Sequence, residues 1–536
     1  SSGKLSNITI GSNLATSGGA LYIQNGLTLA DGVNFNIGGT WLYFNTANQS
    51  VTTPGAATIQ MAGGGLYVYA ANSTLTLGSG LTVQGYGTAT SAYSGNTIVN
   101  NGTILNNTAN TLTISPAIFT NNGTVRATST GRIDVTPTNL TQAGAMTNDG
   151  SGTFNIAPNS AWTNSGTIAN NSGTLSLDAA NDTAKITNAG NLALNAGTLN
   201  LGGSTILSDV LLSAGFTRAA GTTLNVTGVL DLQNSATALD IGTNGAFGPG
   251  GLGTLSGTIR NGTLVAGADN KTLASSSGKL SNITIGSNLA TSGGALYIQN
   301  GLTLADGVNF NIGGTWLYFN TANQSVTTPG AATIQMAGGG LYVYAANSTL
   351  TLGSGLTVQG YGRVASAYSD GAIVNNGVIN ASTAGQTLTV DPASFTNAGT
   401  VQSTAGTLNL SPTTFNQNGS LLASGGTLTV NPTNAWSNAA GSIGISAGTF
   451  NLGGTTTLAN LQAGTFSRTG GTLNLTGTLD LGGSTIGIDS GGTFGTGGLS
   501  TLSGTLRNGT ITGTTLTTSS GKLSNITIGS NLATSG

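Results

Sequence analysis

The side chains that most often carry out chemistry are scarce in this chain. Its 536 residues include no His, Cys or Glu, and its 14 acidic residues are all Asp. Nucleophilic triads and the usual zinc sites need His or Cys, so the sequence leaves no material for them. The closest two aspartates are Asp178 and Asp182, and no group of aspartates recurs at a fixed spacing. We therefore expect no enzyme, no metal site and no other cofactor.

Tyrosine has a more informative distribution. All 12 tyrosines lie within residues 22–93 or within the corresponding segment 297–368. Tyr22, Tyr43 and Tyr67 each stand between two apolar residues and recur at nearly equal intervals along the chain. In a chain that coils with turns of this length, alternation places the apolar neighbours inside and the tyrosines outside, one above another. The expected outward aromatic stripe contains Tyr22, Trp41, Tyr43, Tyr67 and Tyr69 and, in the second segment, Tyr297, Trp316, Tyr318, Tyr342 and Tyr344.

Such a stripe has two interpretations. It could be an outer ladder whose rings only support neighbouring turns. It could also be a contact surface for a second fibre or for sugar rings, because exposed aromatic patches mark binding sites. Of the two kinds of contact we favour contact between proteins, since an uncharged stripe that recurs along the chain suits lateral assembly.

The charged residues show one further pattern. Arg218, Asp240 and Arg260 recur at intervals of about 21 residues, so they predict a small ion ladder on successive turns. Exposed ion pairs of this kind contribute little to stability. A similar set, with less even spacing, comprises Arg468, Asp489 and Arg507.

The composition is that of a chain with very little charge. It has 88 Gly, 38% hydrophobic residues and 26 charged residues (12 basic and 14 acidic), with a net charge of −2. Because there is no basic patch, we expect no nucleic-acid partner. The low charge also removes the repulsion that keeps proteins apart, so lateral association is tolerated. The absence of Cys fits a secreted protein held by its backbone ladder, and no apolar run approaches the roughly 18 residues of a membrane span.

The elements that must position these residues are repeats. Residues 1–87 recur unchanged at 276–362, and the first 18 of them recur at 519–536. The predicted repeat units are therefore 1–275 and 276–518, followed by the start of a third at 519–536. We expect them to form one continuous solenoid, and we expect the chain to be a segment of a longer protein.

A shorter period lies within each repeat unit. Phe119, Leu140 and Trp162 begin similar strings and recur at intervals of about 21 residues. Strings such as Thr-Leu-Thr-Ile at 111–114 alternate polar and apolar residues, which indicates strands and not helices. Asn-Gly, Ser-Gly and Gly-Gly between the strings allow sharp corners. The aromatic residues expected to pack inward at these corners are Phe119, Trp162, Phe395, Phe415 and Trp436.

These periods predict an all-β fold, a right-handed parallel β-helix with three short strands and about 21 residues per turn. Residues 5–10 (LSNITI), 19–29 (GALYIQNGLTL) and 119–125 (FTNNGTV) resemble segments of giant bacterial surface proteins, namely filamentous haemagglutinins and autotransporter passengers. The resemblance extends along essentially the whole chain. It implies a secreted or cell-surface β-helical fibre that is often adhesive.

We therefore expect a structural segment of an extracellular fibre, a filament, sheath or surface stalk, that associates with itself end to end and laterally. A glycan- or surface-binding adhesin is the alternative, with surface glycans as its partners. Two weaker alternatives are a polysaccharide lyase and an ice-binding protein. The Thr pairs at 74/76 and 111/113 suggest an ice-binding threonine array, but Arg132 and Asp134 interrupt it.

Overall fold

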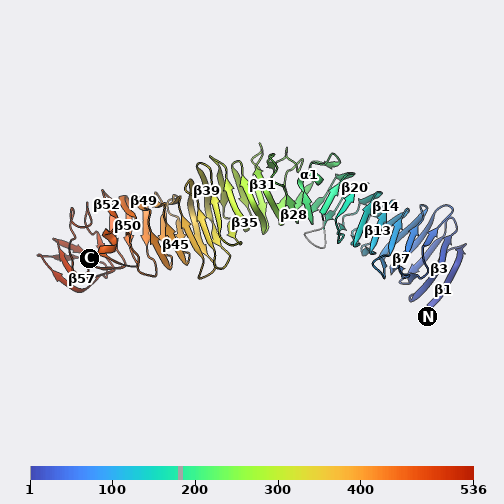
Figure 1. Ribbon diagram of the computed structural model, residues 1–536, viewed down its shortest axis with the longest axis horizontal. Helices are drawn as coiled ribbons and strands as arrows, with labels where there is room; N and C mark the ends of the chain where they lie inside the picture. The colour runs from blue at the N-terminus through green and yellow to red at the C-terminus, as the bar shows by residue number, and fades with distance from the viewer. Residues whose placement is uncertain (1, 179–184) are drawn as a thin grey trace. The chain divides into compact units, whose positions relative to one another are not determined.

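The computed structural model describes residues 2–178 and 185–536 of the chain (Figure 1). They form a parallel β-solenoid of about 24 turns with about 22 residues per turn, and 2% of the chain is helical. The predicted all-β, parallel β-helical fold is confirmed, and the mean turn is slightly longer than predicted. The right-handed sense of the coil stays a prediction.

Three short strands make one turn in the regular part of the solenoid. The strands of the first regular turns are β10 (Thr97–Asn100), β11 (Thr103–Asn106), β12 (Thr111–Ser115), β13 (Ile118–Asn121), β14 (Thr124–Ala127), β15 (Arg132–Val135), β16 (Asn139–Gln142), β17 (Ala145–Asn148) and β18 (Thr153–Ile156). β10 pairs with β13, β11 with β14 and β12 with β15, always in parallel. The same step of three strands connects β13, β14 and β15 to β16, β17 and β18. The prediction of three strands per turn is therefore confirmed in this region.

The core is built from the inward residues of these strands. In β12, Leu112 and Ile114 are completely buried while the alternate threonines face outward. Phe119 lies in register with Leu140, and Phe395 stacks on Phe415 with ring centroids 5.9 Å apart. All five aromatic residues predicted to pack inward are buried. Each apolar residue therefore finds its partners on the turns before and after its own.

Buried amides extend this stacking to polar residues at the strand ends. The side-chain amide of Asn100 donates to Asn121 at 2.8 Å, and that of Asn121 donates to Gln142 at 2.9 Å. Asn121 also donates to the carbonyl of Ala145 at 3.1 Å. These bonds compensate the cost of placing amides in the interior, and they hold consecutive turns in register.

The two identical segments fold into a mixture of long and short strands. In the first copy these are β1 (Ser2–Ile10), β2 (Leu14–Ala15), β3 (Ala20–Leu29), β4 (Asn34–Gly38), β5 (Trp41–Phe44), β6 (Gln49–Thr52), β7 (Ala57–Val68), β8 (Thr74–Leu77) and β9 (Leu81–Ser91). In the second copy they are β33 (Gly278–Ile285), β34 (Leu289–Ser292), β35 (Ala295–Leu304), β36 (Asn309–Gly313), β37 (Trp316–Phe319), β38 (Gln324–Thr327), β39 (Ala332–Val343), β40 (Thr349–Leu352) and β41 (Leu356–Ser366). Asn25 and Asn300, at the same position of β3 and β35, have φ angles of 57° and 56°, and a Gly follows each.

The turns near the end of each long repeat are irregular. Two short helices lie there, α1 (Leu207–Val210) and α2 (Leu458–Gln462), and the hydroxyl of Thr457 caps α2 by accepting the N–H of Asn460 at 3.0 Å. The later strands used below are β28 (Val229–Asp231), β31 (Thr258–Val265), β54 (Thr478–Asp480), β57 (Thr505–Thr512) and β59 (Lys522–Ile528). Asp231 of β28 lies in register with Arg260 of β31, 29 residues later. Turns as long as this one contribute to a mean turn that is longer than predicted.

The chain divides into two compact units. One consists of residues 1–235, 239–261 and 267–269, and the other of 236–238, 262–266 and 270–536. This division follows contacts between residues, whereas the three repeat units were defined by sequence identity, so the predicted repeat boundaries stay predictions.

Candidate functional site

The ten predicted aromatic residues form two clusters, one in each compact unit. The first aromatic cluster consists of Tyr22, Trp41, Tyr43, Tyr67 and Tyr69, and the second of Tyr297, Trp316, Tyr318, Tyr342 and Tyr344. The strands alternate as expected, because in β5 the buried Leu42 and Phe44 flank the half-buried Tyr43. The outward position of the tyrosines is therefore set by the two-residue period of the strand.

Register places the tyrosines of the first cluster in one column. Tyr22 of β3 pairs with Tyr43 of β5, and Tyr43 pairs with Tyr67 of β7. The rings of Tyr22 and Tyr43 stack with centroids 5.2 Å apart and an angle of 27° between their planes. The rings of Tyr43 and Tyr67 meet edge to face at 5.2 Å. Tyr69, which is 47% exposed, contacts both Tyr43 and Tyr67.

A glycine makes room for the tryptophan of this cluster. Trp41 lies in register with Gly65, and its ring meets Tyr67 edge to face at 6.0 Å. A Cβ atom at Gly65 would lie 2.9 Å from the Trp41 ring and 2.1 Å from the carbonyl oxygen of Thr88. Any side chain at this position would therefore displace the tryptophan or the next strand.

The second cluster repeats this arrangement and is larger. Tyr297 stacks on Tyr318 at 5.3 Å and 27°, and Tyr318 meets Tyr342 edge to face at 5.7 Å. Tyr344 contacts Tyr318 and also Tyr368, at 6.3 Å. Burial raises the pKa of the Tyr318 phenol, and the neighbouring phenols of Tyr297, Tyr342 and Tyr344 raise it further.

Tyr368 is a member of the second cluster that the sequence-based prediction did not include. The signal was present, since Tyr368 follows Tyr344 at the same interval that separates Tyr67 from Tyr43. It is 44% exposed and extends the ring contacts by one further turn.

An ion pair borders the second cluster. Arg363 lies in register with Gly340 of the preceding turn. The guanidinium of Arg363 binds the carboxylate of Asp391 through Nε–Oδ1 at 2.8 Å and Nη2–Oδ2 at 2.7 Å. The hydrogen bonds that Arg363 donates to Asp391 raise the pKa of Arg363, burial lowers it, and the charges of Asp391 and Tyr342 raise it further. In the first copy the corresponding position is Thr88. The two clusters therefore have the same arrangement of corresponding rings, and they differ at one edge.

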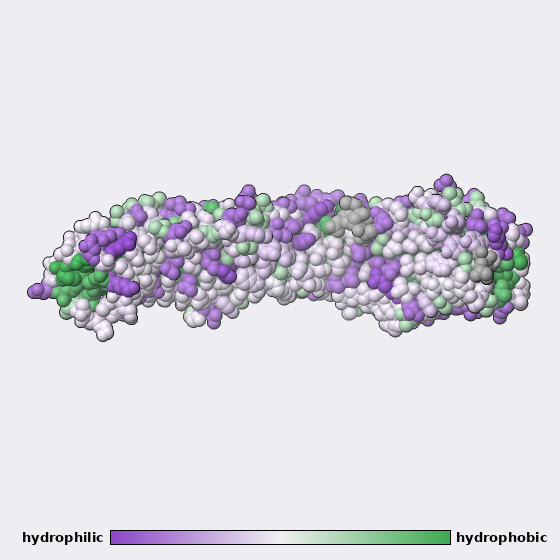
Figure 2. Space-filling model, turned by 90° about the horizontal axis from the view of Figure 1, so that it is seen from below, coloured by the Kyte–Doolittle hydropathy of each residue, from purple (hydrophilic) through white to green (hydrophobic). Residues whose placement is uncertain are grey.

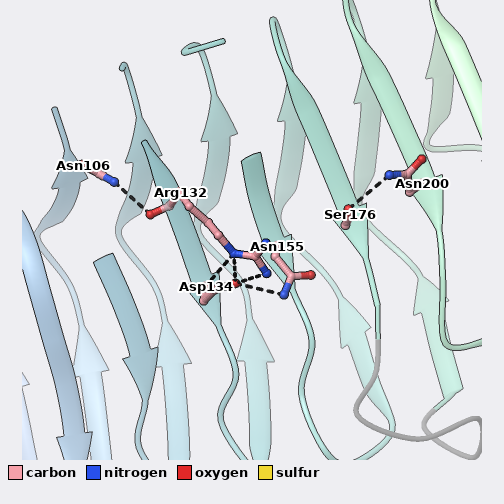
Figure 3. Close-up of polar contacts among 6 residues, drawn as sticks. All are labelled: Asn106, Arg132, Asp134, Asn155, Ser176 and Asn200. Carbon is pink, nitrogen blue, oxygen red and sulfur yellow. Dashed lines mark hydrogen bonds and ion pairs between the residues drawn. The ribbon is translucent and has the colours of Figure 1, made fainter. Parts of the chain in front are cut away.

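A polar ladder occupies a different outward column (Figure 3). Asp134, Asn155, Ser176 and Asn200 follow one another in register on successive turns. The amide of Asn155 donates to Asp134 at 3.1 Å, and the amide of Asn200 donates to the hydroxyl of Ser176 at 3.4 Å. Arg132 binds Asp134 from the same strand, with Nε 2.7 Å from Oδ1. These bonds are between neighbouring residues of the solenoid and stabilise its outer surface.

Arg132 and Asp134 interrupt the threonine array. Thr111 lies in register with Arg132, and Thr113 lies in register with Asp134. The side-chain amide of Asn106 also donates to the carbonyl of Arg132 at 2.9 Å, which fixes the strand that breaks the array (Figure 3). Threonine therefore does not form a continuous surface across β12 and β15.

The predicted ion ladder is wrong. Arg260 binds Asp231, with Nε 2.8 Å from Oδ2, and not Asp240. In the corresponding tail of the second repeat, Arg507 binds Asp480 at 2.9 Å and not Asp489. The prediction assumed turns of constant length, whereas these pairs span 29 and 27 residues because long loops leave the solenoid between them.

Arg218, the first member of that ladder, binds the main chain instead. Its guanidinium donates to the carbonyl oxygens of Phe247 and Gly251 at 2.8 and 2.7 Å and to that of Thr222 at 2.6 Å. Burial lowers its pKa. Arg468 occupies the same place in the second repeat and donates to the carbonyls of Gly470, Gly471 and Gly498. These arginines hold the long loops against the solenoid.

The aspartates in the described part of the chain make local contacts with neighbouring turns and loops. Asp31 and Asp306, for example, each accept a backbone N–H from the next turn at 2.7 Å. Within residues 2–178 and 185–536, no group of three or more possible metal ligands is close enough to hold an ion. Asp182, one of the closest pair in the sequence, lies outside the described residues.

An apolar hollow lies beside α2. It has a volume of about 260 Å³ and is lined by Leu458, Leu461, Phe466 and Phe494 together with Gln462 of α2, Gly464 and Thr493. The two Phe rings meet edge to face at 6.4 Å. The hollow is open to solvent, and none of the residues that line it carries a charge that would orient a ligand.

No protein-family model matches this chain, and neither the curated proteins nor the solved structures contain a significant match to it. The predicted relationship to filamentous haemagglutinins and autotransporter passengers therefore has no support beyond the shared type of fold. No helix in the described part of the chain is long and apolar enough to span a membrane.

Proposed function

We propose that this chain is a structural segment of an extracellular fibre and that its copies associate laterally through the aromatic clusters. The proposal keeps the architectural resemblance to bacterial surface fibres and assigns no enzymatic activity. Its central observation is the pair of outward aromatic clusters, each with rings from several successive turns and each carrying an exposed tyrosine, Tyr69 or Tyr344.

The low charge of the chain favours a second copy of the chain as the partner. Only 26 of 536 residues are charged (12 basic and 14 acidic), so two copies do not repel one another strongly. The face of the molecule in Figure 2 is mostly near neutral in hydropathy, with scattered hydrophilic residues and hydrophobic patches. Tyr and Trp are the residues that most often supply binding energy at protein interfaces. Because the chain carries the same cluster twice, each copy offers two sites for such a contact.

The mechanism of such a segment is mechanical. Parallel ladders connect each turn to the next, so backbone donors and acceptors are satisfied along the solenoid and few are open to proteases. Lateral aromatic contacts would then join neighbouring solenoids, with the Arg363–Asp391 ion pair at the edge of the second cluster.

The experiment removes the central rings of both clusters. A variant with Tyr43, Tyr67, Tyr318 and Tyr342 replaced by Ser should lose lateral association, with the association free energy reduced by about 2 kcal/mol or more for each cluster. Sedimentation velocity and electron microscopy measure the association, and circular dichroism checks the fold.

The matched control replaces Tyr86 and Tyr361 by Ser. The Tyr86 ring lies close to Gly63 on the preceding turn, with Cε2 3.6 Å from the position of a Cβ there, and Tyr361 lies equally close to Gly338. Because Tyr86 and Tyr361 are tyrosines outside the two aromatic clusters, this control should associate like the unaltered chain. Bundles that survive the fourfold substitution in a folded protein would exclude the proposal.

A glycan-binding adhesin remains the alternative because Tyr69 and Tyr344 present phenol rings to solvent. Sugar rings stack on such faces, and their hydroxyl groups bind the tyrosine hydroxyl. A glycan array separates the two functions, since an adhesin binds defined glycans as a single solenoid, whereas the fibre contact needs only further copies of the chain.

A further inference from the structure

The tyrosine contacts between consecutive turns have a chemical consequence that is independent of lateral assembly. Tyr43 is in ring contact with Tyr22, Tyr67 and Tyr69, at centroid distances of 5.2, 5.2 and 5.8 Å. In the second copy Tyr318 is the corresponding hub, in contact with Tyr297, Tyr342 and Tyr344 at 5.3, 5.7 and 5.4 Å. Each hub therefore touches phenol rings from the turn before it and the turn after it.

We propose that these two clusters are sites of oxidative tyrosine coupling, at which dityrosine bonds join one turn of the solenoid covalently to the next. The oxidant is a haem peroxidase acting with hydrogen peroxide. Two phenols each lose one electron and one proton, and the peroxide takes up both electrons and both protons as its O–O bond breaks to give two molecules of water. The two phenoxyl radicals join through ring carbons next to their hydroxyl groups, and the hydrogens on those carbons return to the oxygens.

The rest of the chain directs such an oxidant to the tyrosines. Thiols react readily with oxidants, but the chain has no Cys. Its three methionines, Met61, Met146 and Met336, are all buried. Tyr69, Tyr344 and Tyr368 are 44–47% exposed and are in ring contact with other tyrosines, so a radical formed at the surface has a partner within the cluster.

The folded structure also supplies the geometry of coupling. Tyr22 and Tyr43 pair in register, and their planes differ by only 27°, as do those of Tyr297 and Tyr318. Coupling therefore requires a local adjustment of two side chains and no change in strand register. A bond between Tyr43 and Tyr67 would close a covalent loop across one turn, which opposes the opening of that turn as a disulfide would.

The experiment treats the intact chain with a haem peroxidase and hydrogen peroxide at a concentration at which it is a monomer. Dityrosine fluorescence measures the yield, and mass spectrometry locates peptide pairs that have lost two hydrogen atoms. The expected product joins Tyr43 to Tyr22 or to Tyr67 within one molecule. Because residues 1–87 and 276–362 are identical, a chain with Tyr318→Phe is needed to assign these peptides to the first copy.

The decisive variant carries Tyr43→Phe and Tyr318→Phe, which keep the rings and remove the phenols at both hubs. It should lose the cross-linked peptides of the hubs and still associate laterally, so failure of this proposal is distinguishable from failure of the proposed function. The control with Tyr86→Phe and Tyr361→Phe should couple as well as the unaltered chain, and the denatured chain should lose the selectivity for hub peptides.

Three outcomes would overturn the proposal. They are dityrosine that forms mainly between molecules and rises with protein concentration, dityrosine located at Tyr86 and Tyr361, and an unchanged peptide pattern in the hub variant or in denaturant.

Discussion

The two copies of the identical segment, residues 1–87 and 276–362, show how context acts on the same sequence. Tyr22 pairs with Tyr43 in the first copy, and Tyr297 pairs with Tyr318 in the second, with ring distances of 5.2 and 5.3 Å. The register and the outward stack are therefore reproduced wherever the sequence occurs. This is expected for a solenoid, because most contacts of a turn are with its nearest neighbours.

Burial in a solenoid strand depends on the adjacent turn. Leu280 is completely buried and Leu289 is 2% exposed. In the second copy a preceding turn covers these residues, and Gly286 donates its N–H to the carbonyl of Leu264 on that turn at 2.8 Å.

The following turn changes the copies at the other edge. Arg363 and Asp391 form an ion pair beside the second aromatic cluster, and Thr88 stands in place of the arginine in the first. The ring contacts of the described residues include Tyr344 with Tyr368, but not Tyr69 with Tyr93. Sequence differences that follow an identical segment thus alter the surface that the segment presents.

The largest expected effect tests burial by the adjacent turn. Leu280→Ala should destabilise its turn by about 2–5 kcal/mol, because it leaves a cavity in a closed core. The control substitution Leu212→Ala, at a side chain that is 56% exposed, should cost less than about 1 kcal/mol. Hydrogen exchange of the amides in β33 and β35 measures the first loss, and that of the amides around α1 measures the second. Equal losses at the two leucines would contradict this account of burial.

A smaller effect is expected at the edge of the clusters. A double-mutant cycle of Tyr344→Ala and Tyr368→Ala should give a coupling of about 0.5–1.5 kcal/mol, the usual value for an aromatic pair. The matched cycle of Tyr69→Ala and Tyr93→Ala should give a coupling near zero. Hydrogen exchange of the strands beneath each pair provides the free energies, and a coupling of the same size in both copies would contradict the difference between the two clusters.

The smallest effect concerns pH. The pKa of Tyr318 is raised above the usual value near 10, first by burial and then by its tyrosine neighbours. Folding therefore favours its neutral form, so the associated stability is fully present below about pH 10 and is lost as pH rises through the higher pKa of the folded state. An absorbance titration of phenolate formation should lose a late component in Tyr318→Phe. The idea is wrong if that variant and the unaltered chain titrate alike at the alkaline end.

Much of the fold could be predicted because its signals are local. The alternation in Leu42-Tyr43-Phe44 sets which side chains face inward, and the near-constant spacing of Phe119, Leu140 and Trp162 reveals the turn length. The same two periods predicted the ten clustered aromatic residues. They failed for Arg218 and Arg260, because a count of residues cannot reveal where a long loop leaves the solenoid.

The order of residues in the chain was enough to determine the strands, their inward faces and the column of tyrosines, since each depends on the two-residue strand period and on turns of similar length. Only the tertiary structure decided that Arg218 binds loop carbonyls and that Tyr368 joins the second cluster. These outcomes depend on which side chains the adjacent turn supplies, and that turn lies about 22 residues away in sequence but in direct contact in space.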